Sequence, residues 1–442
     1  MWLKAEAPEL HLGTMTPDIE ARTIRKVRRR ILPFVFILFI IAALDRNNIG
    51  FAALTMNTQL AIDSQQYGFI AAMFFPGYVL FEIPSNLLLY RLGARPWIAR
   101  ILISWGIVAI LTGFAQTASH LYVARFLLGA AEAGYFPGIL LYLTYWFRQR
   151  ELGHTIALFM TANAVANIIG APVSGVILDH VHWLGMASWR WLLILEGLPA
   201  IVGGILTYLF LPSRPAEATF LSSEEKHWLT TALAVEETHK LAKRHIAADQ
   251  LLKDRRVWHL TAAYFGVLIA FWVVTFWMPQ LLKDLSGGYS NTAVGVLVMI
   301  PYLAALAVMI VVGRSSDAKL ERRYHSAIPL IVGSLSLVLM ATVGAGSLFV
   351  SMLLWCVLAS CIYSVFGPFW ALPSRFLTGY AAAAGIAMIN ALGNVGGFVG
   401  PYAIGAIIKK TGSSQGGLVF VAMTLLVSAS LILAFRDRAA DA

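Results

Sequence analysis

The sequence predicts an all-α membrane protein with twelve transmembrane helices in two six-helix bundles and with both termini in the cytoplasm. Three observations predict this class: the apolar composition, the length of the apolar segments and the distribution of basic residues. Of the 442 residues, 59% are hydrophobic and 13% are charged, about half the charged fraction of a typical soluble domain. The apolar residues occur in blocks of about 20, long enough to cross a bilayer core. This pattern excludes a soluble enzyme, a secreted disulfide-rich protein and a disordered chain.

Twelve apolar blocks account for the predicted spans. In lipid every backbone polar group needs an internal partner, so each block is predicted to be a helix. The predicted spans are 31–53, 66–90, 97–117, 120–145, 153–178, 190–211, 258–282, 291–312, 326–346, 348–371, 381–408 and 416–435. Both cysteines, Cys356 and Cys361, lie inside one block, so no disulfide framework is expected.

The basic residues predict the orientation. With the N-terminus inside, the segments on the cytoplasmic side hold 27 Lys and Arg residues, and those on the other side hold four. Short cytoplasmic loops of membrane proteins carry such an excess. The net charge of +10 is therefore explained by topology and by contact with anionic membrane lipid, and no nucleic-acid partner is expected.

The longest polar stretch divides the chain into two halves. We predict a cytoplasmic N-terminal arm, a first bundle, a cytoplasmic linker, a second bundle and a cytoplasmic tail, at 1–30, 31–211, 212–257, 258–435 and 436–442. A more compact N-terminal tail would begin at Met15. Residues 1–14 are therefore either an extension that results from the choice of start site or a disordered arm. Within the linker, Ser222 and Glu225 form the capping-box pattern that opens an amphipathic helix over 221–243; a solvated linker is the alternative.

The two halves repeat each other at one displacement. A shift of 227 residues places 163–170 on 390–397, with asparagines aligned at both ends of the shared Asn-x-x-x-Asn pattern, and it also places the loop 90–95 on 317–322. A parallel repeat of six and six helices is one way in which secondary transporters are built, with the substrate site at the midplane between the halves.

Several motifs, in order along the chain, resemble those of the major facilitator superfamily of transporters. They are LDRNNIGFA (44–52), FEIPSN (81–86), RFLLGAAEAG (125–134), WRW (189–191) with EG (196–197), GPFWALP (367–373) and the run 390–401. Within that superfamily the chain is similar to the anion:cation symporter family, which includes transporters of tartrate, galactonate and phthalate. The resemblance implies a proton-coupled carrier of organic anions that works by alternating access.

Charged residues inside the spans point to function, because a charge at mid-bilayer costs roughly 2.5–3.5 kcal/mol on insertion scales. The repeat offset places Trp272, Val273, Met352 and Ala359 where the first half has Asp45, Arg46, Arg125 and Glu132. The second bundle therefore does without these four charges. Their sum is zero when both acids are ionised, and protonation of either acid makes the site net positive. Proton and anion binding would then favour each other, which is the reciprocal coupling of a symporter.

The resemblance assigns roles to these groups. In similar transporters the arginine of the first span holds the substrate carboxylate, so Arg46 is expected to anchor the anion. Asp45 and Glu132 match acids that carry protons in such transporters. We assign Arg125 to their support, while a buried Arg125–Glu132 salt bridge without a transport role is the alternative. Glu82 and Glu196 are interpreted as structural.

Uncharged polar residues complete the expected substrate site. Buried amides need hydrogen-bond partners, and substrate hydroxyls or neighbouring helices can supply them. The predicted substrate-binding residues besides Arg46 are Tyr78, Asn163, Trp370, Ser374, Asn390 and Asn394. We expect Pro368 and Pro373 to interrupt the tenth span near Trp370 and Ser374. Tyr264, Trp272 and Tyr363 are weaker candidates, more often used for packing.

The function expected from these residues is proton-coupled uptake of a small organic anion, a hydroxylated mono- or dicarboxylate such as tartrate or a sugar acid. No enzyme motif, metal site or cofactor is expected, and the proton gradient supplies the energy. We expect a monomer in the inner membrane. The alternatives are a sodium-coupled carrier or uniporter, and a transporter-like sensor or membrane enzyme that carries no flux.

Overall fold

The structure is a computed structural model that describes residues 17–242, 253–343, 346–377 and 379–435. The predictions about residues 1–14, the tail 436–442 and part of the linker lie outside the described residues. In the first half the helices are α1 (Pro17–Gln59), α2 (Ser64–Ala72), α3 (Phe74–Leu92), α4 (Ala94–Thr112), α5 (Ala118–Glu132), α6 (Tyr135–Thr144), α7 (Gln149–His180) and α8 (Ser188–Phe210), with a short 3₁₀ turn η1 (Trp183–Gly185) before α8.

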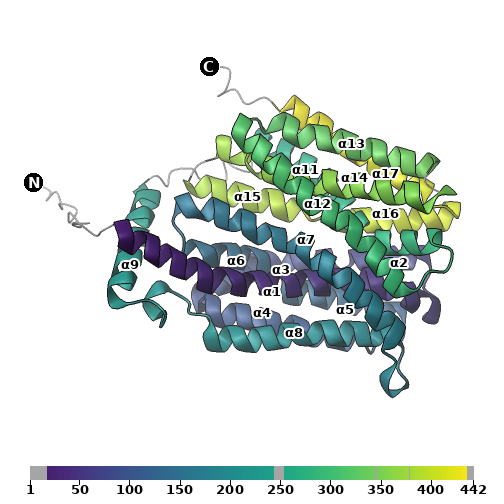
Figure 1. Ribbon diagram of the computed structural model, residues 1–442, viewed down its shortest axis with the longest axis horizontal. Helices are drawn as coiled ribbons and strands as arrows, with labels where there is room; N and C mark the ends of the chain where they lie inside the picture. Colours follow the sequence, from purple (N-terminus) through teal and green to yellow (C-terminus); the bar gives the residue numbers. More distant parts are fainter. Residues whose placement is uncertain (1–16, 243–252, 344–345, 378, 436–442) are drawn as a thin grey trace, which may run out of the picture.

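The linker and the second half are helical as well. After the turn η2 (Pro215–Glu217) come α9 (Ser223–Ala242), α11 (Arg255–Leu285), α12 (Asn291–Lys319), α13 (Arg323–Thr342), α14 (Leu348–Trp370), η4 (Pro373–Arg375), α15 (Gly379–Gly393), α16 (Gly396–Thr411) and α17 (Gln415–Ala434). The bundle helices run side by side along the long axis of the molecule, and α9 lies at one end of it (Figure 1).

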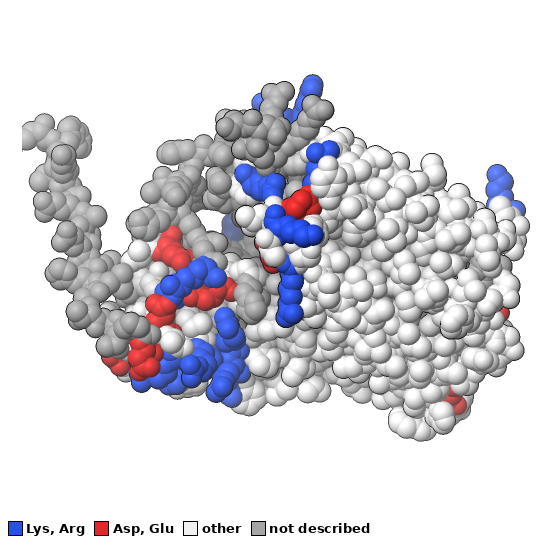
Figure 2. Space-filling model, turned by 45° about the horizontal axis from the view of Figure 1, so that its top comes forward, with Lys and Arg blue, Asp and Glu red and all other residues white. Residues whose placement is uncertain are grey.

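The predicted membrane class is confirmed. Eleven helical segments within the described residues are long and apolar enough to cross a membrane, and these residues form no strand. α1 is not one of the eleven, but it packs beside α7 and α8 and completes the predicted twelve. Large apolar side chains such as Leu80 and Phe210 are exposed on the outside of the bundle, and charged residues gather mainly near the α9 end (Figure 2). The side of the membrane on which the ends lie stays a prediction.

Three of the predicted spans are interrupted within the bundle. Span 2 breaks at Met73 into α2 and α3, and span 4 breaks after Glu132 into α5 and α6. In both cases a proline, Pro76 or Pro137, occupies the third position of the second helix. Proline has no N–H to bond the carbonyl one turn earlier, so the helix is interrupted at that point. Span 11 divides likewise into α15 and α16 at a glycine-rich stretch.

The expected interruption of span 10 occurs later than predicted. Pro368 lies inside α14, which continues to Trp370, and Pro373 begins the separate turn η4. Because a helix near its C-terminal end tolerates the loss of one internal hydrogen bond, Pro368 does not end it. Ser374 is consequently exposed on the turn after the helix.

The linker helix begins as the capping box predicts. The backbone N–H of Glu225 donates to Ser222 Oγ at 3.2 Å, and the backbone N–H of Ser222 donates to Glu225 Oε2 at 2.9 Å. Glu225 also accepts hydrogen bonds from Arg22 at 3.0 Å and Lys26 at 2.9 Å, both on α1. These bonds attach α9 to the first helix of the bundle.

The two halves are joined most closely at the end opposite α9. Asp179 of α7 accepts hydrogen bonds from the backbone N–H and side chains of Asn291 and Thr292, at 2.7 to 3.1 Å. Beside this contact, α2 packs on α16, and Lys409 pairs with Asp63 at 2.9 Å. The seam therefore contains polar bonds between the halves as well as helix packing.

Candidate functional site

Asp45 is buried in the middle of α1 and contacts α4. Its side chain accepts a hydrogen bond from Trp105 Nε1 at 2.5 Å and one from Asn48 Nδ2 at 3.3 Å. Only 1% of the residue is exposed, and no cation lies within ion-pair distance among the described residues. Asp45 is thus held by neutral donors in an apolar setting.

Arg46 points to a different neighbour, because adjacent residues lie about 100° apart around a helix. Its guanidinium forms an ion pair with Glu132 at the end of α5. The rings of Phe74, Tyr78 and Trp272 surround it, with centroids 5.3, 5.7 and 5.6 Å from Cζ. Trp272 belongs to the second half, so Arg46 lies where the two halves meet.

Arg125 is buried without a matching anion. It is 1% exposed, and its Nε and Nη2 groups have no hydrogen-bond partner. Its Cζ lies 5.3 Å from the centroid of Phe74 and 5.9 Å from that of Phe276. The alternative of an Arg125–Glu132 salt bridge is not what the structure shows, since Glu132 pairs with Arg46.

A backbone contact brings these charges together. A methyl group at Gly129 of α5 would meet the carbonyl oxygen of Phe74, so only glycine allows α5 to pack this closely against α3. Gly129 lies one turn from both Arg125 and Glu132. The close approach therefore places Arg125 against the ring of Phe74, while Glu132 on the same helix reaches Arg46.

Asparagines form a second polar group beside the charges. Asn47 Nδ2 donates to Asn167 Oδ1 at 3.0 Å, and the Tyr363 hydroxyl donates to Asn163 Oδ1 at 3.1 Å. Asn167 Nδ2 in turn donates to the Asn163 carbonyl at 2.9 Å. This network joins α1 and α7 of the first half to α14 of the second half.

The other predicted residues lie in the second half and are less tightly grouped. Asn390 faces Glu82 across the interface, while Asn394, just after the end of α15, donates to the carbonyl of Asn390 in that helix at 2.9 Å. The ring of Trp370 packs edge-on against Tyr264, with centroids 4.9 Å apart. Ser374 bonds only backbone carbonyls of its own turn and is exposed, away from the charge cluster.

Glu196 and Glu82 are both buried. Ser174 Oγ donates to Glu196 Oε1 at 2.8 Å, whereas Glu196 Oε2 and Glu82 Oε2 have no hydrogen-bond partner. Their placement within the helix packing leaves the interpretation of both as structural residues a prediction.

The sequence reasoning did not single out Trp105, Phe74 or Asn47. A signal for Trp105 was present, because an indole N–H in the middle of an apolar span requires a buried acceptor. Phe74 gave no such signal: an aromatic residue in a membrane helix is ordinary. Only the helix packing shows that its ring contacts two guanidinium groups.

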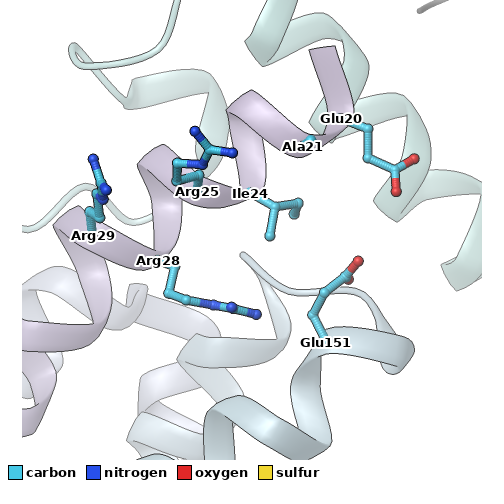
Figure 3. A pocket seen from close by; sticks show the side chains of 7 residues that line it. All are labelled: Glu20, Ala21, Ile24, Arg25, Arg28, Arg29 and Glu151. Carbon is cyan, nitrogen blue, oxygen red and sulfur yellow. The ribbon is translucent and has the colours of Figure 1, made fainter. Parts of the chain in front are cut away.

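A separate pocket of about 310 Å³ lies at the α9 end of the molecule. Its lining comprises Glu20, Ala21, Ile24, Arg25, Arg28, Arg29 and Glu151, and Arg28 points toward Glu151 across it (Figure 3). Arg28 and Arg46 are 18 residues apart in α1, which is about 27 Å along the helix axis. The pocket is therefore distinct from the site of the four buried charged residues, Asp45, Arg46, Arg125 and Glu132.

Comparisons with known proteins agree with this architecture. The family model described as Major Facilitator Superfamily matches residues 35–401. A relative from Agrobacterium vitis named "Putative tartrate transporter" is 43% identical, and the match covers 95% of this chain and 93% of that protein. The inner membrane transport protein RhmT of Escherichia coli is 33% identical, covering 93% of this chain and 95% of its own.

Solved structures show the same fold at low identity. The crystal structure of a D-xylose-proton symporter matches with a TM-score of 0.74 and 15% identity, over 92% of this chain and 98% of that one. A bacterial homologue of the human lysosomal transporter Spinster matches with a TM-score of 0.73 and 15% identity, over 92% and 96%.

Proposed function

The chain belongs to the Major Facilitator Superfamily, and from this premise we propose that it is a proton-coupled symporter of a small organic anion. It is a multi-pass transporter of the inner membrane and not an enzyme. The substrate that we propose is a hydroxylated mono- or dicarboxylate. Tartrate is the first candidate, because the name of a relative 43% identical to this chain refers to tartrate.

The observation that carries the proposal is the ion pair between Arg46 and Glu132 at the meeting of the two halves. While Glu132 is ionised, it occupies the guanidinium that a substrate carboxylate would need. A proton on Glu132 removes that competitor and leaves Arg46 free to form a charge-assisted, bidentate bond with the substrate. Proton binding and anion binding then promote each other, as linkage requires.

Asp45 supports the same coupling as a second proton site. It lies next to Arg46 in sequence and is held by Trp105 and Asn48 rather than by a cation. An ionised carboxylate is costly in an apolar interior unless it is paired, so a proton on Asp45 is the form that such burial favours. Tyr78, Asn163 and Asn390 are proposed to bond the hydroxyl groups of the substrate.

The contacts that join the two halves at Asp179 and Asp63 suggest how the halves move during the transport cycle. With both termini inside, as the basic residues predict, the seam at Asp179 and Asp63 closes the outer side. The cycle that we propose opens this seam to load proton and anion, closes it over them, and releases both at the α9 end. Arg46 contacts Phe74 of the first half and Trp272 of the second half, and secondary transporters of this class bind substrate between their two halves.

The test is uptake of radiolabelled tartrate into proteoliposomes with an imposed pH gradient. The wild type should accumulate tartrate when the outside is acidic. Glu132→Gln should lose this accumulation but retain exchange of internal for external tartrate, because the neutral side chain mimics the protonated acid. The matched control is Glu224→Gln, on the exposed face of α9, which should behave as the wild type.

Other outcomes would contradict the proposal. Uptake that follows a sodium gradient and ignores pH would favour a sodium-coupled carrier. Tartrate binding without exchange would favour a sensor. An unchanged pH profile in Glu132→Gln would remove Glu132 from the coupling.

A further inference from the structure

Arg125 is a fully buried cation whose potential partners are all engaged elsewhere. Glu132 pairs with Arg46, and Asp45 accepts its bonds from Trp105 and Asn48. The Tyr67 hydroxyl, which lies near Arg125, donates to the carbonyl of Phe276 at 2.7 Å and does not accept a hydrogen bond from Nε or Nη2 of the guanidinium. Two nitrogens of the guanidinium, Nε and Nη2, remain without an acceptor.

A buried guanidinium without a partner, such as that of Arg125, is unfavourable unless an anion binds to it. Buried charges in proteins are normally paired, and an unpaired one costs far more than an unpaired neutral group. The rings of Phe74 and Phe276 stabilise the cation only in part, since they accept no conventional hydrogen bond. The repeat offset places Met352 at the corresponding position of the second half, so the bundle packing does not require an arginine here.

The two arginines are close enough to act on one small molecule. Their Cζ atoms lie on the same ring, each 5.3 Å from the centroid of Phe74, so they are at most twice that distance apart. Each also contacts a ring of the second half: Arg46 lies against Trp272 and Arg125 against Phe276. Both guanidinium groups therefore border the interface that must open when substrate enters.

We infer that Arg125 is a second anion-binding residue, and that the transported substrate is a small dicarboxylate held between Arg46 and Arg125. The inference rests on the proposed function and deepens it, because it selects dicarboxylates over monocarboxylates. Arg46 is available only when Glu132 gives it up, whereas Arg125 has no competing carboxylate. One carboxylate of the substrate binds Arg125, and the other replaces Glu132 on Arg46.

The test compares two probes that differ by one charge, tartrate and its monomethyl ester, on purified protein by isothermal titration calorimetry. The wild type should bind tartrate about 30-fold or more tightly than the monoester, as expected when one partner of a buried charge pair is removed. Arg125→Gln should abolish this preference, so that tartrate and the monoester bind with equal affinity, because only Arg46 then remains to hold a carboxylate of either probe. Arg125→Lys, which keeps the charge, should retain part of the preference.

The outcomes separate this inference from the function on which it rests. If the wild type binds tartrate and the monoester equally well, the two-anchor site is wrong and the carboxylate carrier stands. The same holds if Arg125→Gln weakens both probes alike, since that pattern indicates a structural role. If the wild type binds neither probe nor any other carboxylate, the proposed function fails as well. Even if the Arg125→Gln variant does not fold, the ratio of the two affinities on the wild type tests whether the site holds two carboxylates.

Discussion

Arg46 and Arg125 are identical in chemistry, but the structure gives them different surroundings. Arg46 has a carboxylate partner and a side chain that is 13% exposed, whereas Arg125 is 1% exposed and has none. The sequence assigned the anion to Arg46 and a supporting role to Arg125. Spacing along a helix shows which groups share a face, but it does not show which acid reaches which base across three helices.

Replacement of Arg46 by alanine should abolish binding of the anion. The variant loses a charge-assisted bidentate contact and leaves Glu132 buried without its cation, each a large effect in a desolvated site. We expect the affinity for tartrate to fall by at least about 30-fold, the lower end for a buried charge pair. Isothermal titration calorimetry measures this affinity. Arg314→Ala, near the C-terminal end of α12, is the control and should bind tartrate as the wild type does. If Arg46→Ala keeps the affinity of the wild type, Arg46 does not belong to the site.

Helix contacts explain how the halves hold together at the end opposite α9. Asp179 accepts bonds from the first residues of α12, where the helix dipole favours a negative charge. Asp179→Asn should weaken this closure by about 1 kcal/mol, the usual value of such a cap, and so lower the closed population about fivefold relative to the open one.

The opening can be measured by electron paramagnetic resonance. Spin labels at Leu184→Cys and Tyr289→Cys, both exposed and on opposite halves at this end, report the separation, with Cys356 and Cys361 replaced by serine. Asp179→Asn should add a population at longer distance. Glu321→Gln, in the loop after α12, should not, and equal distributions for all three proteins would show that Asp179 does not hold the seam.

The attachment of α9 to α1 should depend on pH. Burial opposes ionisation of Glu225, but hydrogen bonds from Lys26 and from the backbone N–H of Ser222 outweigh it and lower the pKa of this carboxyl. A lowered pKa means that the contact stabilises the folded arrangement above the unfolded pKa of Glu, about 4.3. This contribution is lost as the pH falls through the lower folded value.

Glu225→Gln should reproduce the acid state at neutral pH. We expect hydrogen exchange in α9 to rise a few-fold, because the neutral amide would keep the cap only in part and would lose the ion pairs to Arg22 and Lys26. Glu224→Gln is the matched control, since Glu224 is exposed and lies 3.8 Å from Arg22. If exchange in both variants equals that of the wild type, Glu225 does not attach α9.

The two halves share matches at one repeat offset, and the repeat is visible in their packing. Gly68 and Gly295 lie 227 residues apart, the repeat offset. A methyl group at Gly68 would meet the carbonyl oxygen of Pro401, and one at Gly295 would meet that of Ala171. Each half thus contributes one glycine at which a helix of the other half approaches closely. The charges do not follow this symmetry, because all four lie in the first half.

The orientation of the molecule is tested by labelling in intact cells. Leu184→Cys should react with a membrane-impermeant maleimide added outside, and Glu224→Cys should react only after the membrane is permeabilised. The reverse pattern would place the termini outside and would make the closed seam the inner one. The label is introduced into protein without Cys356 and Cys361, so that the signal reports one site.

From the order of the amino acids alone we could predict the membrane class, the spans, the capping box of α9 and the residues whose charge the bundle does not require. These features are predictable because each depends on local composition, on the spacing of residues along the chain or on a comparison of the two halves. The packing of the helices was needed to show that Glu132 pairs with Arg46, that Trp105 donates to Asp45, and that Phe74 lies against both arginines. These contacts join residues on different helices, and their distances follow from how the helices pack, including the close approach that Gly129 allows. The interruption of α5 after Glu132 is likewise a result of backbone geometry near Pro137, which a count of apolar residues does not register.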